Sequence, residues 1–113
     1  MELTAEELPQ GIKLIRLNGR MDLRGAQEID LKFTANATAA QALVIVDLSG
    51  VEFLASLGLR TLLSGAKGQR GRGGKLVLAA AQPLVSKVLT SSGIQNLIPA
   101  YPTVEEAVTA LTP

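Results

Sequence analysis

VIVDLSGVEFLASLGLRTLL, residues 44–63, decides the fold because it joins an apolar, β-branched strand to a helix that opens on a serine. The continuous apolar run at 43–46 is typical of a strand covered on both faces. After a turn, the helix buries one stripe of residues spaced at i, i+3, i+4 and i+7, namely Leu59, Leu62, Leu63 and Ala66. The N–H groups and the positive dipole end at the start of this helix favour an anion, including a phosphate on Ser56 itself.

Strands and helices alternate along the rest of the chain. Two strands are predicted at 3–8 and 12–17, where they form a hairpin around Pro9, and Gly19 ends the strand at 12–17. Two further strands are predicted at 75–80 and 97–100. Helices are predicted from residue 24 to about 39 behind a capping Asp22, at 83–93, and after Thr103, while the glycines from 68 onward end the helix that starts at Ser56. The order β-β-α-β-α-β-α-β-α predicts an α/β fold with a mostly parallel, four- to five-stranded mixed sheet and about four helices.

Composition limits the chemistry. With 113 residues, 47% apolar and 19% charged, the chain suits one domain over 1–113. The absence of Cys and His removes thiolates, imidazole bases and nearly all zinc-type sites, so we expect no enzymatic activity, no cofactor and no metal. An acidic N-terminus, and apolar runs far short of the ~20 residues that span a bilayer, predict a cytoplasmic protein with no membrane contact.

Charge is distributed unevenly along the chain. No Asp or Glu lies between Glu52 and Glu105, so Lys and Arg prevail in the second half although the net charge is only +1. This pattern indicates either a solvated helix surface or a basic face directed at an acidic protein or a phosphate. The tract GQRGRGGK at 68–75 has the wrong spacing for a phosphate-binding P-loop and lacks the aromatic residues that stack on RNA bases, so we expect no direct nucleic-acid binding and read it as a turn between a helix and a strand.

Function in such sheets tends to lie at the carboxyl ends of the strands. The loops predicted at 18–24, 47–56 and 79–83 all lie at such ends and could converge at one edge.

At this point the chain resembles the STAS domains, named for sulfate transporters and anti-sigma factor antagonists. The likeness rests on LIRLNGRMDL at 14–23, GKLVLAA at 74–80, the segment at 91–108, and above all on Asp47-Leu48-Ser49, Phe53 and Ser56-Leu57-Gly58-Leu59. These match the family signature of a strand ending in Asp-Leu-Ser/Thr, then an aromatic or aliphatic residue and Ser-x-Gly-Leu at a helix start. The resemblance is strongest to single-domain bacterial antagonists.

The resemblance implies a partner-switching regulator. The unphosphorylated domain would bind an anti-sigma factor that is also a serine kinase of the GHKL type, and phosphorylation would abolish this binding until a serine phosphatase reverses it. The acceptor would be Ser56, and the partner would contact Asp22, Ala55, Leu57, Gly58 and Arg60. The domain itself would be a monomer or a weak dimer.

Two positions depart from the family pattern. Ala55 stands where Asp or Ser is frequent, which removes a hydrogen bond that could assist phosphorylation, and Leu57 stands where Ser, Thr or Ala is frequent. Helical geometry places Leu57 with Arg60, Thr61 and Ser64, on a polar face, which suggests that it contacts another molecule.

Two alternatives remain open at this stage. Ser56 and Asp22 could serve only as helix caps, which are worth about 1 kcal/mol each. The domain would then be a STAS module that binds a transport, secretion or signalling complex without switching. A phosphorylated receiver domain is disfavoured because the chain has neither an Asp-Asp pair nor a suitably placed late lysine.

Overall fold

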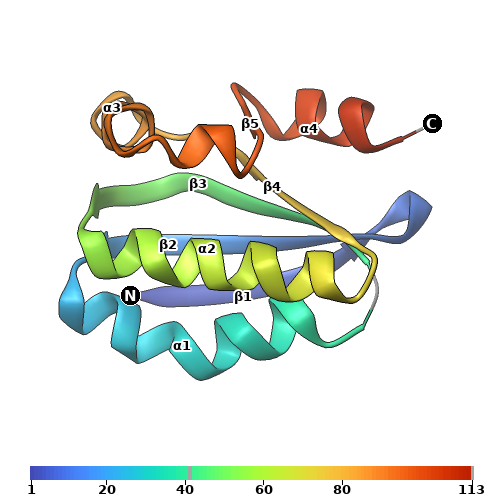
Figure 1. Cartoon of the computed structure of the whole chain (residues 1–113), viewed down its shortest axis with the longest axis horizontal. Coiled ribbons are helices and arrows are strands. Elements are labelled where there is room, and N and C mark those ends of the chain that lie inside the picture. The colour runs from blue at the N-terminus through green and yellow to red at the C-terminus, as the bar shows by residue number, and fades with distance from the viewer. Residues whose placement is uncertain (41, 113) are drawn as a thin grey trace.

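The computed structural model describes residues 1–40 and 42–112 and contains a five-stranded sheet in the order β1-β2-β3-β4-β5 (Figure 1). β1 is antiparallel to β2, and the other neighbours are parallel. The strands are β1 (Glu2–Leu8), β2 (Ile12–Met21), β3 (Leu43–Leu54), β4 (Lys75–Ala79) and β5 (Ala100–Tyr101). The helices are α1 (Leu23–Thr38), α2 (Ser56–Gly71), α3 (Pro83–Ser92) and α4 (Val104–Leu111), with short 3-10 turns η1 (Pro9–Gly11) and η2 (Ile94–Asn96). The predicted α/β class and element order are confirmed.

Two strands are longer than the sequence predicted. β2 does not close at Gly19 but runs to Met21 through two shifts in its register with β3. β3 does not turn after Asp47 but continues to Leu54, because the extended β2 provides a hydrogen-bonding partner up to the pair Met21 and Leu54. The loop predicted at 47–56 was therefore wrong, and Ala55 alone separates β3 from α2.

Three boundaries in the second half also differ from the predictions. α2 continues through Gly68 to Gly71, because its last turn is anchored by the buried side chain of Gln69. β4 ends at Ala79, since Ala80 adopts a left-handed backbone conformation with φ of 60°. The strand predicted at 97–100 is displaced to Ala100–Tyr101, because η2 occupies the preceding residues and leaves Leu97 exposed.

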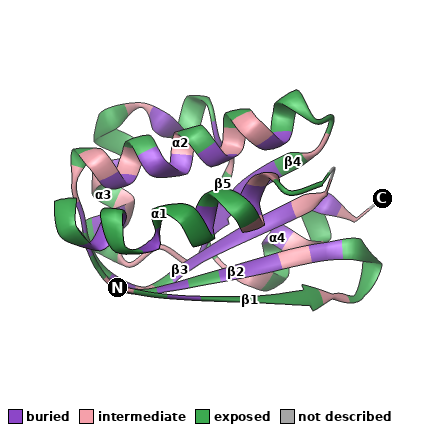
Figure 2. Cartoon of the chain, turned by 90° about the horizontal axis from the view of Figure 1, so that it is seen from below, coloured by how far each residue is buried: buried purple, intermediate pink, exposed green. Residues whose placement is uncertain are grey.

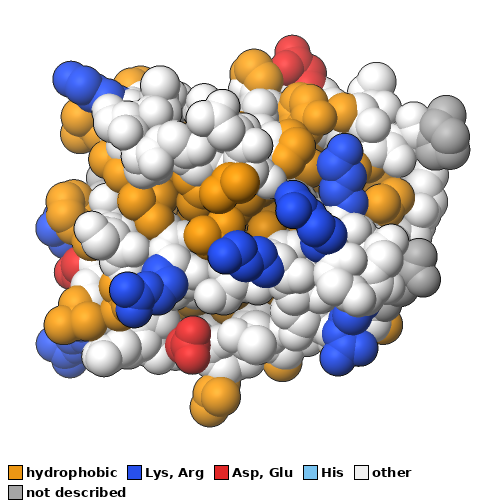
Figure 3. All heavy atoms as spheres, in the orientation of Figure 1, with side chains coloured by type: hydrophobic (Ala, Val, Ile, Leu, Met, Phe, Trp, Pro, Cys, Tyr) orange, Lys and Arg blue, Asp and Glu red, His pale blue; other side chains and the backbone are white. Residues whose placement is uncertain are grey.

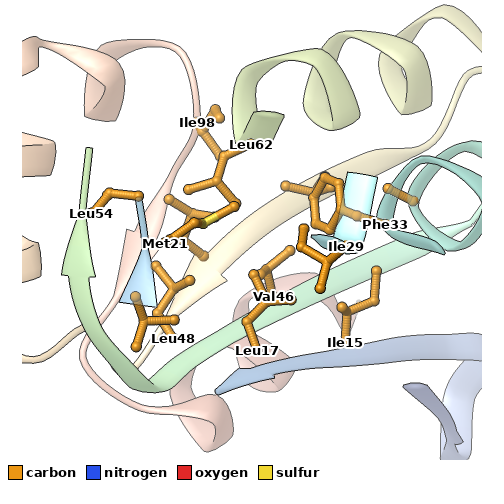
Figure 4. Close-up of a cluster of buried hydrophobic side chains, with 14 of the residues drawn as sticks. Ile15, Leu17, Met21, Ile29, Phe33, Val46, Leu48, Leu54, Leu62 and Ile98 are labelled. Atoms are coloured by element: carbon orange, nitrogen blue, oxygen red, sulfur yellow. The ribbon is translucent and has the colours of Figure 1, made fainter. Parts of the chain in front are cut away.

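The two faces of the sheet carry two hydrophobic clusters. The larger one packs α1, α2 and α3 against the sheet, and in Figure 4 side chains from β2, β3, α1 and α2 point toward one another around Met21, Phe33, Val46 and Leu62. The smaller one places Ala107 and Leu111 of α4 against the opposite face. Figure 2 shows the resulting pattern, in which β2 and β3 are largely buried and β1 is exposed at the edge of the sheet.

Within the described residues no helix is both long and apolar enough to cross a membrane.

Candidate functional site

The start of α2 lies beside the start of α1, at the carboxyl ends of β2 and β3. The Ala55 N–H donates a 3.0 Å hydrogen bond to the Met21 carbonyl, which holds the two strand ends together. α1 begins two residues after Met21 and α2 begins directly after Ala55. The convergence predicted for these two segments is therefore found. The third segment, 79–83, joins further back along β3, where Gln82 Nε2 donates to the Ser49 carbonyl at 2.8 Å.

Ser56 is the first residue of α2 and its side chain is exposed. Ala55, not Ser56, occupies the N-cap position, and no side chain caps this helix. Ser56 is therefore not the capping residue that one interpretation of the sequence allowed. The first N–H groups of a helix have no acceptor within the helix, and the first turn of α2 carries no acidic side chain, so an anion at this position would be stabilised.

Gly58 allows α2 to start this close to the sheet. It is buried, and a Cβ added there would come within 2.7 Å of a Leu54 methyl carbon and 3.0 Å of the Met21 carbonyl oxygen. Gly58 therefore positions Ser56 by packing beneath it, and its own surface is covered by the strand ends.

Asp22 caps α1, as its position in the sequence predicted. One carboxylate oxygen accepts a 2.8 Å hydrogen bond from the Gly25 N–H, and the other lies 3.7 Å from Arg20 Nε. The Gly25 hydrogen bond, helped by the Arg20 charge, lowers the pKa of Asp22 below its ordinary value. The Arg20 guanidinium in turn lies 4.5 Å from the centre of the Phe53 ring, so a charged and aromatic cluster links Asp22 to the end of β3.

Leu57 does not lie on an open polar face. It is half-buried and packs against the larger cluster, beside a hollow of about 260 Å³ that it shares with α1. Thr61, expected on the same polar face, is also buried, and its hydroxyl donates to the Leu57 carbonyl at 3.0 Å. Of the stripe predicted to be buried, Leu62 is fully buried, whereas Leu59, Leu63 and Ala66 are only half-buried. The buried side of α2 also carries small and polar residues beside Leu62, namely Gly58, Thr61, Gly65 and Gln69. Arg60 is exposed, one turn beyond Ser56.

An apolar groove beside Ser56 was not predicted from the sequence. It has a volume of about 570 Å³ and separates the end of β3 from α3, with Phe53, Leu54, Leu84, Val85 and Val88 among its lining residues. Phe53 is 41% exposed and Leu84 is 73% exposed. The signal available in the sequence was an aromatic residue three positions before Ser56, which the prediction of a turn obscured.

Groups of acidic side chains able to hold a metal ion are absent from residues 1–40 and 42–112. Asp47 accepts a hydrogen bond from the Ser49 N–H at 2.9 Å, and Arg16 Nε lies 3.8 Å from its other oxygen. Its carboxylate thus fixes the local backbone of β3. The candidate site consists of an exposed hydroxyl at a helix start, flanked by apolar side chains.

Comparisons with known proteins agree with this geometry. The family model described as STAS domain matches residues 5–107. A Bordetella bronchiseptica protein named anti-sigma factor antagonist BtrV is 29% identical over 110 residues, which cover 97% of this chain and 94% of that protein. An anti-sigma factor antagonist from Mycobacterium paratuberculosis has a similar crystal structure, with a TM-score of 0.87, 26% identity, and coverage of 97% of this chain and 92% of the other. A STAS domain protein from Planctomyces limnophilus gives a TM-score of 0.85 at 27% identity, over 96% of both chains.

Proposed function

This chain belongs to the STAS domain family, and on that premise we propose that it is an anti-sigma factor antagonist controlled by phosphorylation of Ser56. Its partner would be an anti-sigma factor that is also a serine kinase, and a serine phosphatase would restore the binding form. The domain acts by binding alone and catalyses no reaction. The names of the relatives that match nearly their whole length support the first part of this proposal.

The observation that carries the switch is the exposure of Ser56 at the start of α2, between an apolar groove and a smaller hollow of mixed polarity. On one side Phe53 stands at the groove against α3, and on the other Leu57 borders the hollow against α1. A partner that covers these surfaces would desolvate the hydroxyl. A phosphate brings a charge of about −1.5 to −2 into such a contact, and repulsion and desolvation would then weaken it.

The partner surface that we propose comprises Asp22, Ala55, Leu57 and Arg60, together with Phe53. Gly58 contributes by its packing beneath Ser56 instead of by contact. The helix start can hold the phosphate without unfolding, because its N–H groups face the added oxygens.

Mass spectrometry of the protein from its native host tests the modification. We expect an intact-mass species heavier by one phosphate, with fragmentation placing the group on Ser56. A phosphate located only elsewhere, or none across growth and stress conditions, would contradict the switch.

Substitutions then test the consequence of the modification for binding. With the anti-sigma factor recovered from the same host, Ser56→Asp should bind at least about tenfold more weakly than wild type and Ser56→Ala should bind as wild type does. Ser64→Asp is the matched control, since Ser64 is exposed on the same helix two turns further on.

A second candidate is a STAS module that binds a complex without switching. Ala55 favours it, because this N-cap offers the hydroxyl of Ser56 no polar neighbour. In that case Ser56→Asp and Ser56→Ala would bind the partner equally well, and no phosphate would be found.

A further inference from the structure

A second exposed surface begins one turn beyond Ser56, where it shares Arg60 with the proposed partner surface, and runs along α2 away from Ser56. Two adjoining hollows, of about 310 and 350 Å³, separate α2 from the η2 segment. The first is lined by Leu59, Leu63 and Ile94, the second by Ala66 and Leu76, and both by Leu97. Figure 3 shows this region as an apolar strip with Lys and Arg side chains along it. We call it the α2–η2 groove.

The dimensions of the groove suit a short helix. On the α2 side it runs from Leu59 to Arg70, which is about 16 Å at 1.5 Å per residue. That length equals about three helical turns. A helix of this length presents apolar side chains at i, i+3, i+4 and i+7, which can enter both hollows.

The charge along the groove is of one sign. Arg60, Arg70 and Lys75 line it, and none of its lining residues is acidic. Among residues 1–40 and 42–112, none of these three cations lies within ion-pair distance of a carboxylate. Arg70 Nη2 instead donates a long hydrogen bond of 3.4 Å to the Leu97 carbonyl, which places its charge at the rim. The positive charge therefore remains available to a ligand of opposite sign.

Leu97 lies where the two hollows meet. Its side chain is 51% exposed although it is apolar and its neighbour Ile98 is fully buried. The first hollow is mainly apolar, and the second combines Ala66 and Leu76 with polar side chains and the cations Arg70 and Lys75. An exposed leucine between them, next to cations that make no ion pair within the described residues, has the composition of an interface with an apolar centre and a charged rim.

We propose that the α2–η2 groove binds an acidic amphipathic helix of a partner protein, with its apolar side chains in the two hollows and its carboxylates against Arg70 and Lys75. Charge complementarity selects this occupant. A nucleic acid is disfavoured because the lining residues include no aromatic side chain on which bases could stack. The proposal does not rest on phosphorylation of Ser56.

The test uses the full chain labelled with ¹⁵N and two synthetic peptides of 14 residues. Both carry leucines at i, i+3, i+4, i+7 and i+11, with glutamates at the other positions in one and lysines in the other. We expect the glutamate peptide to shift the amide signals of α2 residues 59–70 and of residues 94–97, and to bind more weakly as salt increases. We expect the lysine peptide to leave these signals unchanged.

Variants connect the binding to the groove. The double variant Arg70→Glu/Lys75→Glu and the single variant Leu97→Ser should each weaken the glutamate peptide about tenfold by fluorescence anisotropy. Lys32→Glu and Leu31→Ser are the matched controls, because both residues are exposed on α1, remote from the groove, and these variants should bind as wild type does. Ser56→Asp should also leave the binding of this peptide unchanged, so failure of the proposed switch and failure of this groove are distinguishable.

Three results would overturn the proposal: no binding of the glutamate peptide at millimolar concentration, equal binding of both peptides, or shifts confined to residues outside the groove. A single-stranded oligothymidylate that binds the groove more tightly than the glutamate peptide would also overturn it, in favour of a nucleic-acid site.

Discussion

Asp22 shows how a single residue can serve both local structure and a binding surface. Its carboxylate caps α1 through the Gly25 N–H, while Arg20 connects it to the aromatic ring of Phe53. The sequence left capping and partner contact as alternatives, and the geometry makes them compatible, because the capping oxygen and the oxygen that faces Arg20 are different atoms.

The lowered pKa of Asp22 predicts how stability depends on pH. Because the folded state holds this carboxyl below its unfolded pKa, the stabilisation is fully present above about pH 4 and is lost as the pH falls through the folded pKa. Asn is an equally good N-cap residue but does not titrate. The urea concentration at the midpoint of unfolding should therefore fall less between pH 7 and pH 3 for Asp22→Asn than for wild type.

A second carboxyl provides the control for this experiment. The Met1 amino group, 2.7 Å from Glu28, lowers the pKa of Glu28, so Glu28 also contributes to the acid sensitivity of the wild type. Asp22→Asn in a Glu28→Gln background separates the two effects. Equal falls in the midpoint with and without Asp22 would show that the carboxylate contributes nothing in the folded state.

At the scale of elements, a buried amide side chain joins three segments. Gln69 on α2 is fully buried, its Nε2 donates to the Ala37 carbonyl of α1 at 2.6 Å, and its Oε1 accepts from the Ala42 N–H at 2.9 Å. The Lys75 N–H in turn donates to the Ala42 carbonyl at 3.0 Å. Gln69 thus ties the end of α1 to the starts of β3 and β4.

Replacing Gln69 should be costly because both of its backbone partners would lose their hydrogen bonds in a buried site. Gln69→Leu should lower the free energy of unfolding by roughly 2–4 kcal/mol. Thermal and urea unfolding measure this. Gln27→Leu, at an exposed position on α1, should change stability by no more than about 0.5 kcal/mol. A loss of similar size in both variants would show that the apolar substitution, and not the lost hydrogen bonds, is responsible.

Periodicity predicted the elements well where local signals decide them, and poorly where a neighbouring strand decides them. The hairpin at Pro9 and the caps at Asp22, Gly93 and Thr103 follow from residue chemistry, and all are present. The length of β3 does not follow from residue chemistry, because residues 50–54 are held in an extended conformation by their pairing with β2.

The error at Leu57 has a related cause. Helical spacing assigned the buried face of α2 from its leucines. In the fold Leu62 of that set is fully buried, but the helix also turns small residues inward beside it. Gly65 lies against the ring of Phe33, and this close approach of α1 and α2 half-buries Leu57 as well. The candidate site could thus be located from the sequence, while the contacts of its side chains depended on tertiary packing.

At the scale of the whole molecule, the proposed binding surfaces lie on one face of the sheet, and the smaller hydrophobic cluster, which contributes to stability, lies on the other. Both proposed binding surfaces lie on the side of α1, α2 and α3, and within the described residues α4 is the helix that covers the smaller cluster on the other face. Ile12, Ile45 and Val77 of three neighbouring strands are fully buried there together with Ala107.

This separation predicts that damage to α4 reduces stability without changing recognition. Leu111→Ala removes buried methyl groups and should cost roughly 2–3 kcal/mol of unfolding free energy. Because Leu111 contacts neither Ser56 nor the α2–η2 groove, the affinities for the anti-sigma factor and for the acidic peptide should equal those of wild type at a temperature where circular dichroism shows the variant folded. A lower affinity in a variant that is still folded would contradict this prediction and would show that the two faces of the sheet are coupled. The packing of α4 would then affect the binding surfaces through β3, which contributes Ile45 to the smaller cluster and is separated from α2 by Ala55 alone.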